Sequence, residues 1–364
     1  FLTDMDRLNI RRPWMMPKAT DHIEEQINLV KKIEEKGLTY KTSDGIYFDT
    51  NKFEEDTKKV YGELSTLDQI KAGARVEENP EKKDPRDFAL WKFSGKPGER
   101  QMEWESPWGI GFPGWHIECS AMSMKYLGES FDIHAGGEDL RSTHHPNEIA
   151  QSESATGKQF VKYWIHSAFL QVDGARMSKS KGNAYRLEEL ITKGYDPLAM
   201  RYLYLTGHYR SPLNFTWDSL DNAQKTLNNM RELIRAAKNQ SQRTQLSQEK
   251  AEGMEKFRDE FTMAINDDLN TPKALAAFWS MLKSNLPSQD KYEMALSFDE
   301  VLGLGLGEIA SVEIPQSVMK LVEVREQARK SGDFEEADQA RKEIEKQGYK
   351  VLDTSEGPQV KSNQ

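Results

Sequence analysis

Residues 131–172 read FDIHAGGEDLRSTHHPNEIAQSESATGKQFVKYWIHSAFLQV, and this stretch decides the fold class. Phe131-Asp132-Ile133-His134 predicts a short strand, which Gly136-Gly137 breaks. A helix is expected from about Pro146 through Ala155, and Trp164 through Val172 predicts another strand. Alternation of strand, helix and strand is typical of an α/β protein with a parallel sheet.

The chain before this stretch predicts helical, hairpin and loop segments. Residues 17–36 predict a helix, because Ile23, Ile27, Val30 and Ile33 recur at helical spacing. Residues 38–49 predict a hairpin around Asp44-Gly45. Residues 76–87 and 104–116 are expected to be loops, and Cys119 to Met124 is expected to begin a helix.

The chain after about residue 187 is expected to be almost entirely helical. Leu220, Ala223, Leu227, Met230 and Ile234 form a near-heptad stripe, which is typical of a helix bundle. Residues 311–316 resemble a linker, and two short helices are expected at 317–331 and 334–347, separated by Gly332-Asp333.

Length and composition limit the class of protein. A chain of 364 residues is expected to form roughly two to four domains. No apolar stretch of about 18 residues and no signal peptide pattern is present, so a membrane protein is not expected. The net charge of −9 disfavours a generic nucleic-acid binder, although a local patch can still bind phosphate. A single cysteine, Cys119, excludes an internal disulfide and favours the cytoplasm.

Five of the seven histidines lie between residues 116 and 166, together with the only cysteine. Cys119, His144 and Glu148 offer the three side-chain types that zinc accepts. His144 and Glu148 are four residues apart and share one face if both are helical, with Thr143 as the expected N-cap. Pro146 is tolerable in a first helical turn. The spacing alone is equally that of a buried structural cysteine near a surface histidine and glutamate.

A second signal is the segment RMSKSKGN, residues 176–183. Cations and hydroxyls on a loop are suited to holding phosphate groups. By itself, the segment is also what an ordinary solvated basic turn looks like.

Four segments in order resemble the cysteinyl-tRNA synthetases, a family of class I aminoacyl-tRNA synthetases. Pro113 to Met122 resembles their cysteine-pocket segment, and Gly136 to Leu140 resembles their adenosine-site turn. His144 to Ser152 resembles their zinc helix, and Arg176 to Ser180 is similar to the lysine-rich signature loop of class I synthetases. The resemblance extends from about Leu8 to Asp353.

The resemblance implies a role for each matching residue. The zinc ligands would be Cys119, His144 and Glu148, and the family's fourth ligand is a cysteine upstream of Phe1. The cysteine pocket would contain Trp115, His116 and His134. ATP would be bound by Gly136, Gly137, Asp139 and Lys179. The signature loop would act in catalysis through Lys179, Arg176, Ser178 and Ser180. The anticodon would be bound by Arg329, Asp338 and Arg341.

The resemblance also implies an activity, cofactors and partners. The enzyme would activate L-cysteine with ATP to cysteinyl-adenylate and transfer it to tRNA(Cys), as a cytoplasmic monomer. One Zn2+ per chain would select the thiol over the serine hydroxyl, and Mg2+ would accompany ATP. Two other hypotheses remain open: a related cysteine ligase with a non-tRNA amine acceptor, and a non-catalytic tRNA-binding fragment. A zinc hydrolase would need an open metal site with a water.

The sequence departs from the family at several positions. The N-terminal signature of two histidines is absent, so we expect a chain that starts inside a domain and is inactive alone. Arg141-Ser142-Thr143 stands where the family usually has an apolar residue, Phe and Pro. Pro146 replaces a usual Glu, and Arg176 replaces a common Lys.

The expected fold is a class I synthetase Rossmann-like parallel sheet, incomplete at its N-terminus, followed by an all-α bundle and a small α-rich C-terminal domain. Its predicted divisions are the end of a first catalytic half (1–16), a connective insertion (17–112), a second catalytic half with the zinc site and signature loop (113–186), a stem-contact linker (187–217), a helical bundle (218–310) and an anticodon-binding domain (311–364).

Overall fold

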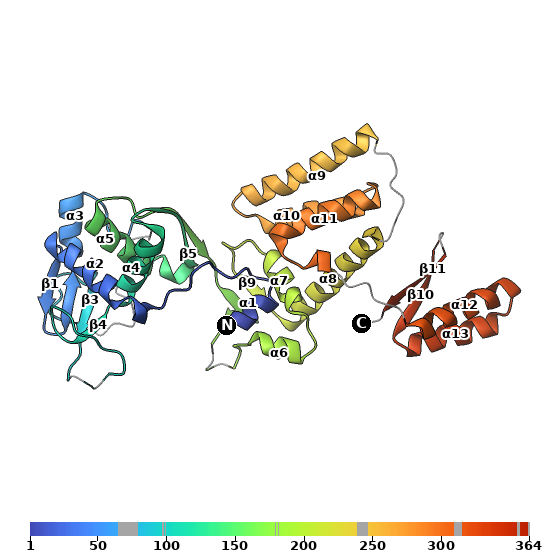
Figure 1. The fold of residues 1–364 in the computed structure, drawn as a ribbon, viewed down its shortest axis with the longest axis horizontal. Coiled ribbons are helices and arrows are strands. Elements are labelled where there is room, and N and C mark those ends of the chain that lie inside the picture. Colours follow the sequence, from blue (N-terminus) through green and yellow to red (C-terminus); the bar gives the residue numbers. More distant parts are fainter. Residues whose placement is uncertain are drawn as a thin grey trace.

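The structure is a computed structural model, and it describes residues 1–64, 79–96, 98, 100–178, 180, 182–238, 247–308, 315–354 and 357–362. Three groups of elements follow one another along the molecule (Figure 1). Each group has its own cluster of buried apolar side chains. Within the described residues, no helix combines the length and apolar character that crossing a membrane requires.

The first group is built on an antiparallel sheet with the strand order β1-β2-β3-β4. The strands are β1 (Thr39–Thr42), β2 (Gly45–Phe48), β3 (Phe88–Phe93) and β4 (Gly111–Pro113). The predicted hairpin is confirmed, with Thr42 opposite Gly45. Residues 79–87 are loop as predicted, whereas the predicted loop at 76–78 lies outside the described residues.

Four helices pack with this sheet around one core that contains Trp91, Phe48 and Ile33. They are α2 (Ile23–Glu35), α3 (Thr50–Thr57), α4 (Trp115–Leu127) and α5 (His144–Thr156). The helix predicted at 17–36 is confirmed from Ile23 onward, after a short 3-10 turn at Ala19–Asp21. The loop predicted at 104–116 is wrong at its end, because β4 pairs with β3 there and α4 begins at Trp115.

The predicted strand–helix–strand unit is confirmed. Strand β5 (Phe131–Gly137) runs parallel to β6 (Val161–Ser167), and α5 connects them. The prediction that Gly136-Gly137 breaks the first strand is wrong, since both glycines pair with β6. The single strand predicted over 164–172 is also wrong. The chain leaves the β5–β6 sheet at Ala168, whose N–H donates to the carbonyl oxygen of Tyr209 at 2.7 Å.

A second small sheet links this unit to the helices. It has the order β8-β7-β9, with β7 (Leu170–Val172) antiparallel to β8 (Ala175–Arg176) and parallel to β9 (Leu213–Phe215). Helices α6 (Leu187–Thr192) and α7 (Pro197–Leu205) follow in this part of the chain, and the short α1 (Leu2–Arg7) lies beside them (Figure 1).

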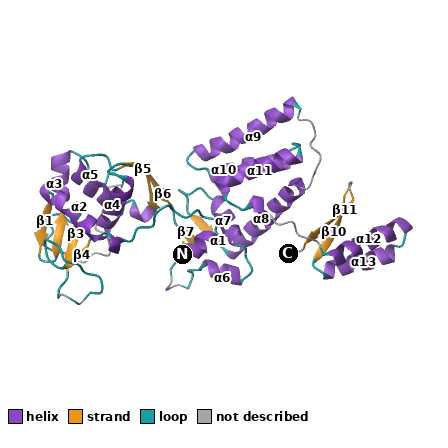
Figure 2. Cartoon of the chain, viewed as in Figure 1, coloured by secondary structure: helices purple, strands orange, loops and turns teal. Residues whose placement is uncertain are grey.

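The middle group is mainly helical, as Figure 2 shows. Its longer helices are α8 (Trp217–Lys238), α9 (Gln248–Asn266), α10 (Thr271–Lys283) and α11 (Ser288–Leu302). The predicted stripe on α8 is confirmed, since all five of its residues are buried in one cluster. The faces of Phe261 and Phe298 stack with ring centroids 4.0 Å apart and join α9 to α11.

The C-terminal group contains α12 (Gln316–Ser331), α13 (Phe334–Lys346), β10 (Tyr349–Thr354) and β11 (Gly357–Ser362). Both predicted helices are confirmed, and Gly332 ends α12 with φ 81°. The antiparallel hairpin β10–β11 was not predicted. It contributes Val351 to the small core formed with Val318, Val322 and Ile344.

Candidate metal centre and substrate site

Two helices bring the predicted metal ligands together. Cys119 lies in α4, and His144 and Glu148 lie one turn apart in the neighbouring α5. One ligand atom from each of the three lies within 4.8 Å of the others. The distance from His144 Nε2 to Glu148 Oε1 is 3.0 Å. The predicted grouping is therefore present in the fold, although its chemical role stays a prediction.

The start of α4 is held close to the antiparallel sheet. A Cβ atom at Gly114, the N-cap of α4, would lie 2.0 Å from the carbonyl oxygen of Ala89 in β3. Only glycine allows this close approach of two backbones. The contact fixes where α4 begins and therefore where Cys119, five residues later, lies.

The start of α5 differs from the prediction. Thr143 occupies the N-cap position, but its side chain makes no capping hydrogen bond. A capping side chain bonds to the N–H of the second or third helical residue, and the third residue here is Pro146, which has no N–H. Thr143 is therefore the N-cap residue, as predicted, but its side chain makes no hydrogen bond there.

Glu148 is fully buried, and both of its carboxylate oxygens lack a hydrogen-bond donor among the described residues. Imidazole nitrogens of His144 and His134 lie 3.0 Å and 3.4 Å from Oε1. Burial alone would raise the pKa of Glu148, but these two imidazoles lower it to about 2. The carboxylate is therefore ionised at neutral pH and has lone pairs available for a cation.

The thiol of Cys119 is half-buried and protonated in the absence of a cation. Burial, followed by the charges of Glu148 and Glu118, raises its pKa to about 12. A divalent cation between the three groups would reverse this effect, because a positive charge stabilises the thiolate. Thiolate, imidazole and carboxylate form a donor set that zinc accepts, so the residues present fit this metal.

A second group of ligand atoms shares Glu148. It consists of His134, His145 and Glu148, also within 4.8 Å of one another. His145 is fully buried, its Nε2 lacks a hydrogen-bond partner among the described residues, and its Nδ1 lies 2.8 Å from His166 Nε2. Burial lowers the pKa of His145 to about 3, so its imidazole is neutral.

The residues predicted for the cysteine pocket surround the same point. His116 Nδ1 lies 2.9 Å from His144 Nδ1, and burial followed by the charge of His144 lowers the pKa of His116 to about 3. The ring of Trp115 is 4.4 Å from that of His144 and is 58% exposed. His134 approaches Glu148 from the side of β5. An exposed indole therefore lies beside the buried imidazole of His144 and the half-buried imidazole of His116.

Three of the predicted ATP residues, Gly136, Gly137 and Asp139, lie at or just after the carboxyl end of β5, next to the histidines. A Cβ atom at Gly136 would lie 2.9 Å from the ring of His145, and one at Gly137 would lie 2.4 Å from a carboxylate oxygen of Asp139. Ligands of open α/β sheets bind outside the carboxyl ends of their strands. The turn therefore occupies a suitable place for a nucleotide, although no contact with one is defined.

The predicted signature loop follows β8 in the second sheet. Ser178 N–H donates to Asn183 Oδ1 at 2.8 Å, and the hydroxyl groups of Ser178 and Ser180 are 2.8 Å apart. The guanidinium of Arg176 lies over the ring of Phe169 at 5.7 Å. The position predicted to matter most, Lys179, lies outside the described residues.

The predicted anticodon residues belong to the C-terminal group. Arg329 forms an ion pair with Asp353, which also pairs with Arg325 at 2.9 Å. Arg341 lies 3.3 Å from Glu345, and Asp338 is exposed on α13. The structure thus gives Arg329 and Arg341 internal partners, and binding of RNA by them stays a prediction.

Comparison with known proteins places the chain in a family. The model of the class I (C) tRNA synthetase catalytic domain matches residues 1–225, and that of the DALR domain matches residues 260–306. Cysteine–tRNA ligase 1 of Burkholderia lata is 46% identical, over 99% of this chain and 74% of that protein. The cysteine–tRNA ligase of Treponema denticola is 41% identical, over 97% of this chain and 76% of that protein.

The chain belongs to the cysteine–tRNA ligase family. The fold agrees with this class of enzyme. Methionyl-tRNA synthetase of Mycobacterium tuberculosis, solved in complex with methionyl-adenylate, is similar with a TM-score of 0.54 and 14% identity, over 92% of this chain and 81% of that one. The predicted class I synthetase fold is therefore confirmed.

Two features of this cysteine–tRNA ligase family member were not assigned from the sequence. The buried His145 pairs with the half-buried His166 next to the metal group, and the density of histidines was the only signal for them. A hydrogen bond joins Tyr61 and Asn147, which are 86 positions apart in the sequence. It connects the segment after α3 to α5, the helix that carries His144 and Glu148. Nothing local in the sequence relates these two residues.

Proposed function

We propose that this chain activates L-cysteine with ATP and transfers the cysteinyl group to tRNA(Cys), with one zinc ion at Cys119, His144 and Glu148. The observation that carries the proposal is the buried carboxylate of Glu148, which lies beside a thiol and an imidazole and whose two oxygens accept no well-aligned hydrogen bond from the described residues. A buried carboxylate in this condition is costly unless a cation neutralises it.

Selection of cysteine follows from the chemistry of the site. Zinc, when bound, accepts a thiolate as a ligand far more readily than an alcohol, so it distinguishes cysteine from serine. Trp115 and His116 would close the side of the pocket, and the neutral state of His116 adds no charge that would repel the substrate ammonium group. A difference of this kind can reject serine without an editing site.

Activation joins two substrates in line. A carboxylate oxygen of cysteine bonds to the α-phosphorus of ATP, the bond to the bridging oxygen breaks, and pyrophosphate leaves with the electron pair. Gly136, Gly137 and Asp139 would hold the adenosine, while Lys179 and Arg176 stabilise the charge that develops on the phosphates. Ser178 and Ser180 would orient the loop, and Mg2+ accompanies the ATP.

The second step transfers cysteinyl to the terminal adenosine of the tRNA. The match to a DALR domain and the identity of 41–46% with cysteine–tRNA ligases over nearly the whole chain favour tRNA over another amine acceptor. Asp338, Arg329 and Arg341 would meet the anticodon. Because a thiol that ligates a metal must stay reduced, we also place the protein in the cytoplasm.

The metal assignment is tested by zinc affinity, measured against a chelator of known affinity. Cys119→Ser is expected to weaken binding several hundredfold or more, because one of three protein ligands carries roughly a third of a binding free energy of about 10–16 kcal/mol. His145→Gln serves as the matched control and should change the affinity only a few-fold. The opposite ranking would place the ion in the group of His134, His145 and Glu148 instead.

The same variant tests the choice of amino acid. With cobalt in place of zinc, free cysteine should add a sulfur-to-metal charge-transfer band, whereas serine should not. Cys119→Ser should lose most of the band that the protein thiol itself contributes. If cysteine and serine changed the spectrum equally, selection through the thiol would be refuted.

A further inference from the structure

A short segment of the insertion crosses to the helix that carries two of the proposed metal ligands. Residues 58–64 follow α3, and Lys58 turns the chain with φ 60°. Lys59 pairs with the buried Glu153 of α5, and Arg141 Nε, just before α5, donates to the carbonyl of Leu64 at 2.7 Å. Both ends of the segment are thus tied to α5 or to its entry.

Tyr61 lies at the centre of this segment and is 6% exposed. Its hydroxyl donates to Oδ1 of Asn147, which is 3% exposed. Asn147 immediately precedes Glu148 and lies three residues after His144 in α5. The hydrogen bond therefore joins the insertion to the same helical turn that presents both ligands.

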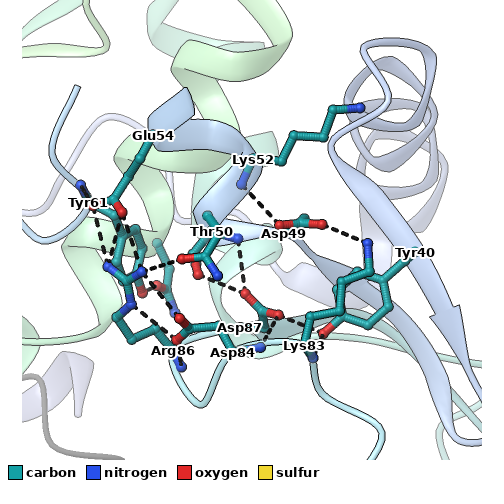
Figure 3. A network of polar contacts seen from close by, with 12 residues as sticks. Tyr40, Asp49, Thr50, Lys52, Glu54, Tyr61, Lys83, Asp84, Arg86 and Asp87 are labelled. Atoms are coloured by element: carbon teal, nitrogen blue, oxygen red, sulfur yellow. Dashed lines mark hydrogen bonds and ion pairs between the residues drawn. The ribbon is translucent and has the colours of Figure 1, made fainter. Parts of the chain in front are cut away.

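Tyr61 is itself held by an ordered polar network, which Figure 3 shows. Its N–H donates to Glu54 Oε1 at 2.9 Å, and the guanidinium of Arg86 lies 5.8 Å from its ring centroid. Arg86 is fixed in turn by Asp84 at 3.0 Å and by Asn51 at 2.6 Å. A side chain held at its backbone, ring and hydroxyl has little freedom to move.

The ring of Tyr61 also reaches the site by a second route. It stacks on Phe88 with centroids 6.3 Å apart, and Phe88 meets the ring of His116 edge to face at 5.7 Å. His116 contacts His144 through their Nδ1 atoms. Tyr61 is therefore linked to the proposed ligand His144 through Phe88 and His116, in addition to its hydrogen bond with Asn147.

The turn that Tyr61 holds has no side-chain cap. The side chain of Thr143 makes no capping hydrogen bond, and Pro146 removes one of the two N–H groups that such a bond could use. Local sequence therefore does little to fix the position of this turn along the axis of α5 or its rotation about that axis. We propose that Tyr61 is a positioning residue that sets the first turn of α5, and hence His144 and Glu148, for metal binding. This inference rests on the metal centre of the proposed function.

The test compares Tyr61→Phe with Tyr40→Phe in the full chain. Tyr40 lies in the same network and donates its hydroxyl to Asp87 at 2.6 Å, so the control removes an equivalent hydroxyl that bonds to Asp87 instead of Asn147. Residues that orient ligands usually contribute 10–100-fold to metal affinity. Because Tyr61 acts through Asn147, we expect about tenfold weaker zinc binding for Tyr61→Phe and less than twofold for Tyr40→Phe.

Zinc affinity is measured by chelator competition at a temperature where circular dichroism shows all variants fully folded. A general loss of stability would not change affinity under these conditions. Tyr61→Phe alone leaves the buried side-chain amide of Asn147 without its partner, and the double variant Tyr61→Phe/Asn147→Leu removes that amide as well. If the double variant regains the stability lost in Tyr61→Phe while its zinc affinity stays low, the positioning role is supported. If zinc affinity is regained together with stability, the role is overturned, because the unpartnered amide of Asn147 would then explain the whole loss.

The outcomes separate this inference from the proposed function. If the unmodified chain binds no zinc, or if Cys119→Ser binds it as tightly, the metal centre itself is refuted. If the unmodified chain binds zinc through Cys119 and Tyr61→Phe binds it equally well, only the role of Tyr61 is refuted.

Discussion

Asp87→Ala is expected to destabilise the first group of elements by about 3–5 kcal/mol. Asp87 is 1% exposed and accepts four hydrogen bonds (Figure 3). Its Oδ1 accepts from the N–H and the hydroxyl of Thr50 at 2.9 Å and 2.7 Å. Its Oδ2 accepts from the hydroxyl of Tyr40 at 2.6 Å and from the N–H of Asp84 at 3.0 Å.

The magnitude follows from the donors that would lose their acceptor. A buried donor without a partner costs about 1–3 kcal/mol, so four donors set an upper bound of about 12 kcal/mol. Water that enters the vacated volume satisfies some of them, which brings the value into the range of about 3–5 kcal/mol known for breaking buried charged pairs. Asp87→Asn keeps one oxygen but turns an NH2 group toward two donors, so about half the loss is expected.

Urea unfolding followed by far-ultraviolet circular dichroism measures this change. Asp56→Ala is the control, because Asp56 is an exposed aspartate on α3 of the same group and its removal should stay within about 0.5 kcal/mol. The reasoning is refuted if Asp87→Ala costs under 1 kcal/mol, or if the asparagine and alanine variants rank in the reverse order.

Three other changes test separate parts of the structure. Lys179→Ala should raise the barrier of cysteine-dependent pyrophosphate exchange by about 2–4 kcal/mol, whereas Lys181→Ala should leave the barrier unchanged. Equal exchange rates for the two variants would remove the catalytic role of Lys179. Gly114→Ala should lower the free energy of unfolding by about 2–4 kcal/mol, since its Cβ would lie 2.0 Å from the carbonyl oxygen of Ala89, and unchanged urea unfolding would disprove the close contact. Hydrogen bonds from two arginines of α12 hold the pKa of Asp353 well below its usual range, so their stabilisation of the C-terminal group is present above pH 4 and lost as the pH falls further. An acid titration of Asp353→Asn by circular dichroism should lack that loss.

Local periodicity accounts for the part of the fold that the sequence predicted well. The stripe on α8 needs only its own helix and one partner surface, and Leu220, Leu227 and Ile234 are fully buried as their spacing predicted. The predicted hairpin likewise depends on one turn, which the structure places at Ser43-Asp44, between Thr42 and its partner Gly45. Such features are decided by neighbours within a few residues.

Contacts between distant residues account for the errors. Residues 164–172 form a continuous β-rich run, and pairing with distant segments, including the bond between Ala168 and Tyr209, decides where one sheet ends and the next begins. The hairpin at the C-terminus was missed because its pairing depends on packing Val351 against α12 and α13. Tertiary contacts of this kind leave no periodic pattern in the sequence.

The candidate site lies between these cases. The pair His144 and Glu148 is readable from a spacing of four, whereas Cys119 is 25 positions upstream and joins them only through the packing of α4 on α5. Resemblance to a family supplied that long-range information, and the geometry agrees with it. The same resemblance did not point to Tyr61, because its contact with Asn147 joins the insertion to the catalytic unit.

The arrangement bears on how the proposed metal centre would be built. Two of its proposed ligands lie on α5, whose N-cap side chain makes no hydrogen bond, and the third lies on α4, whose start is held against β3. The antiparallel sheet and its loops, outside the parallel β5–β6 unit, therefore help to fix the positions of these three residues. If zinc binds there as proposed, we expect changes in this sheet and its loops to alter metal affinity, and with it the preference for a thiol, while every proposed ligand stays the same.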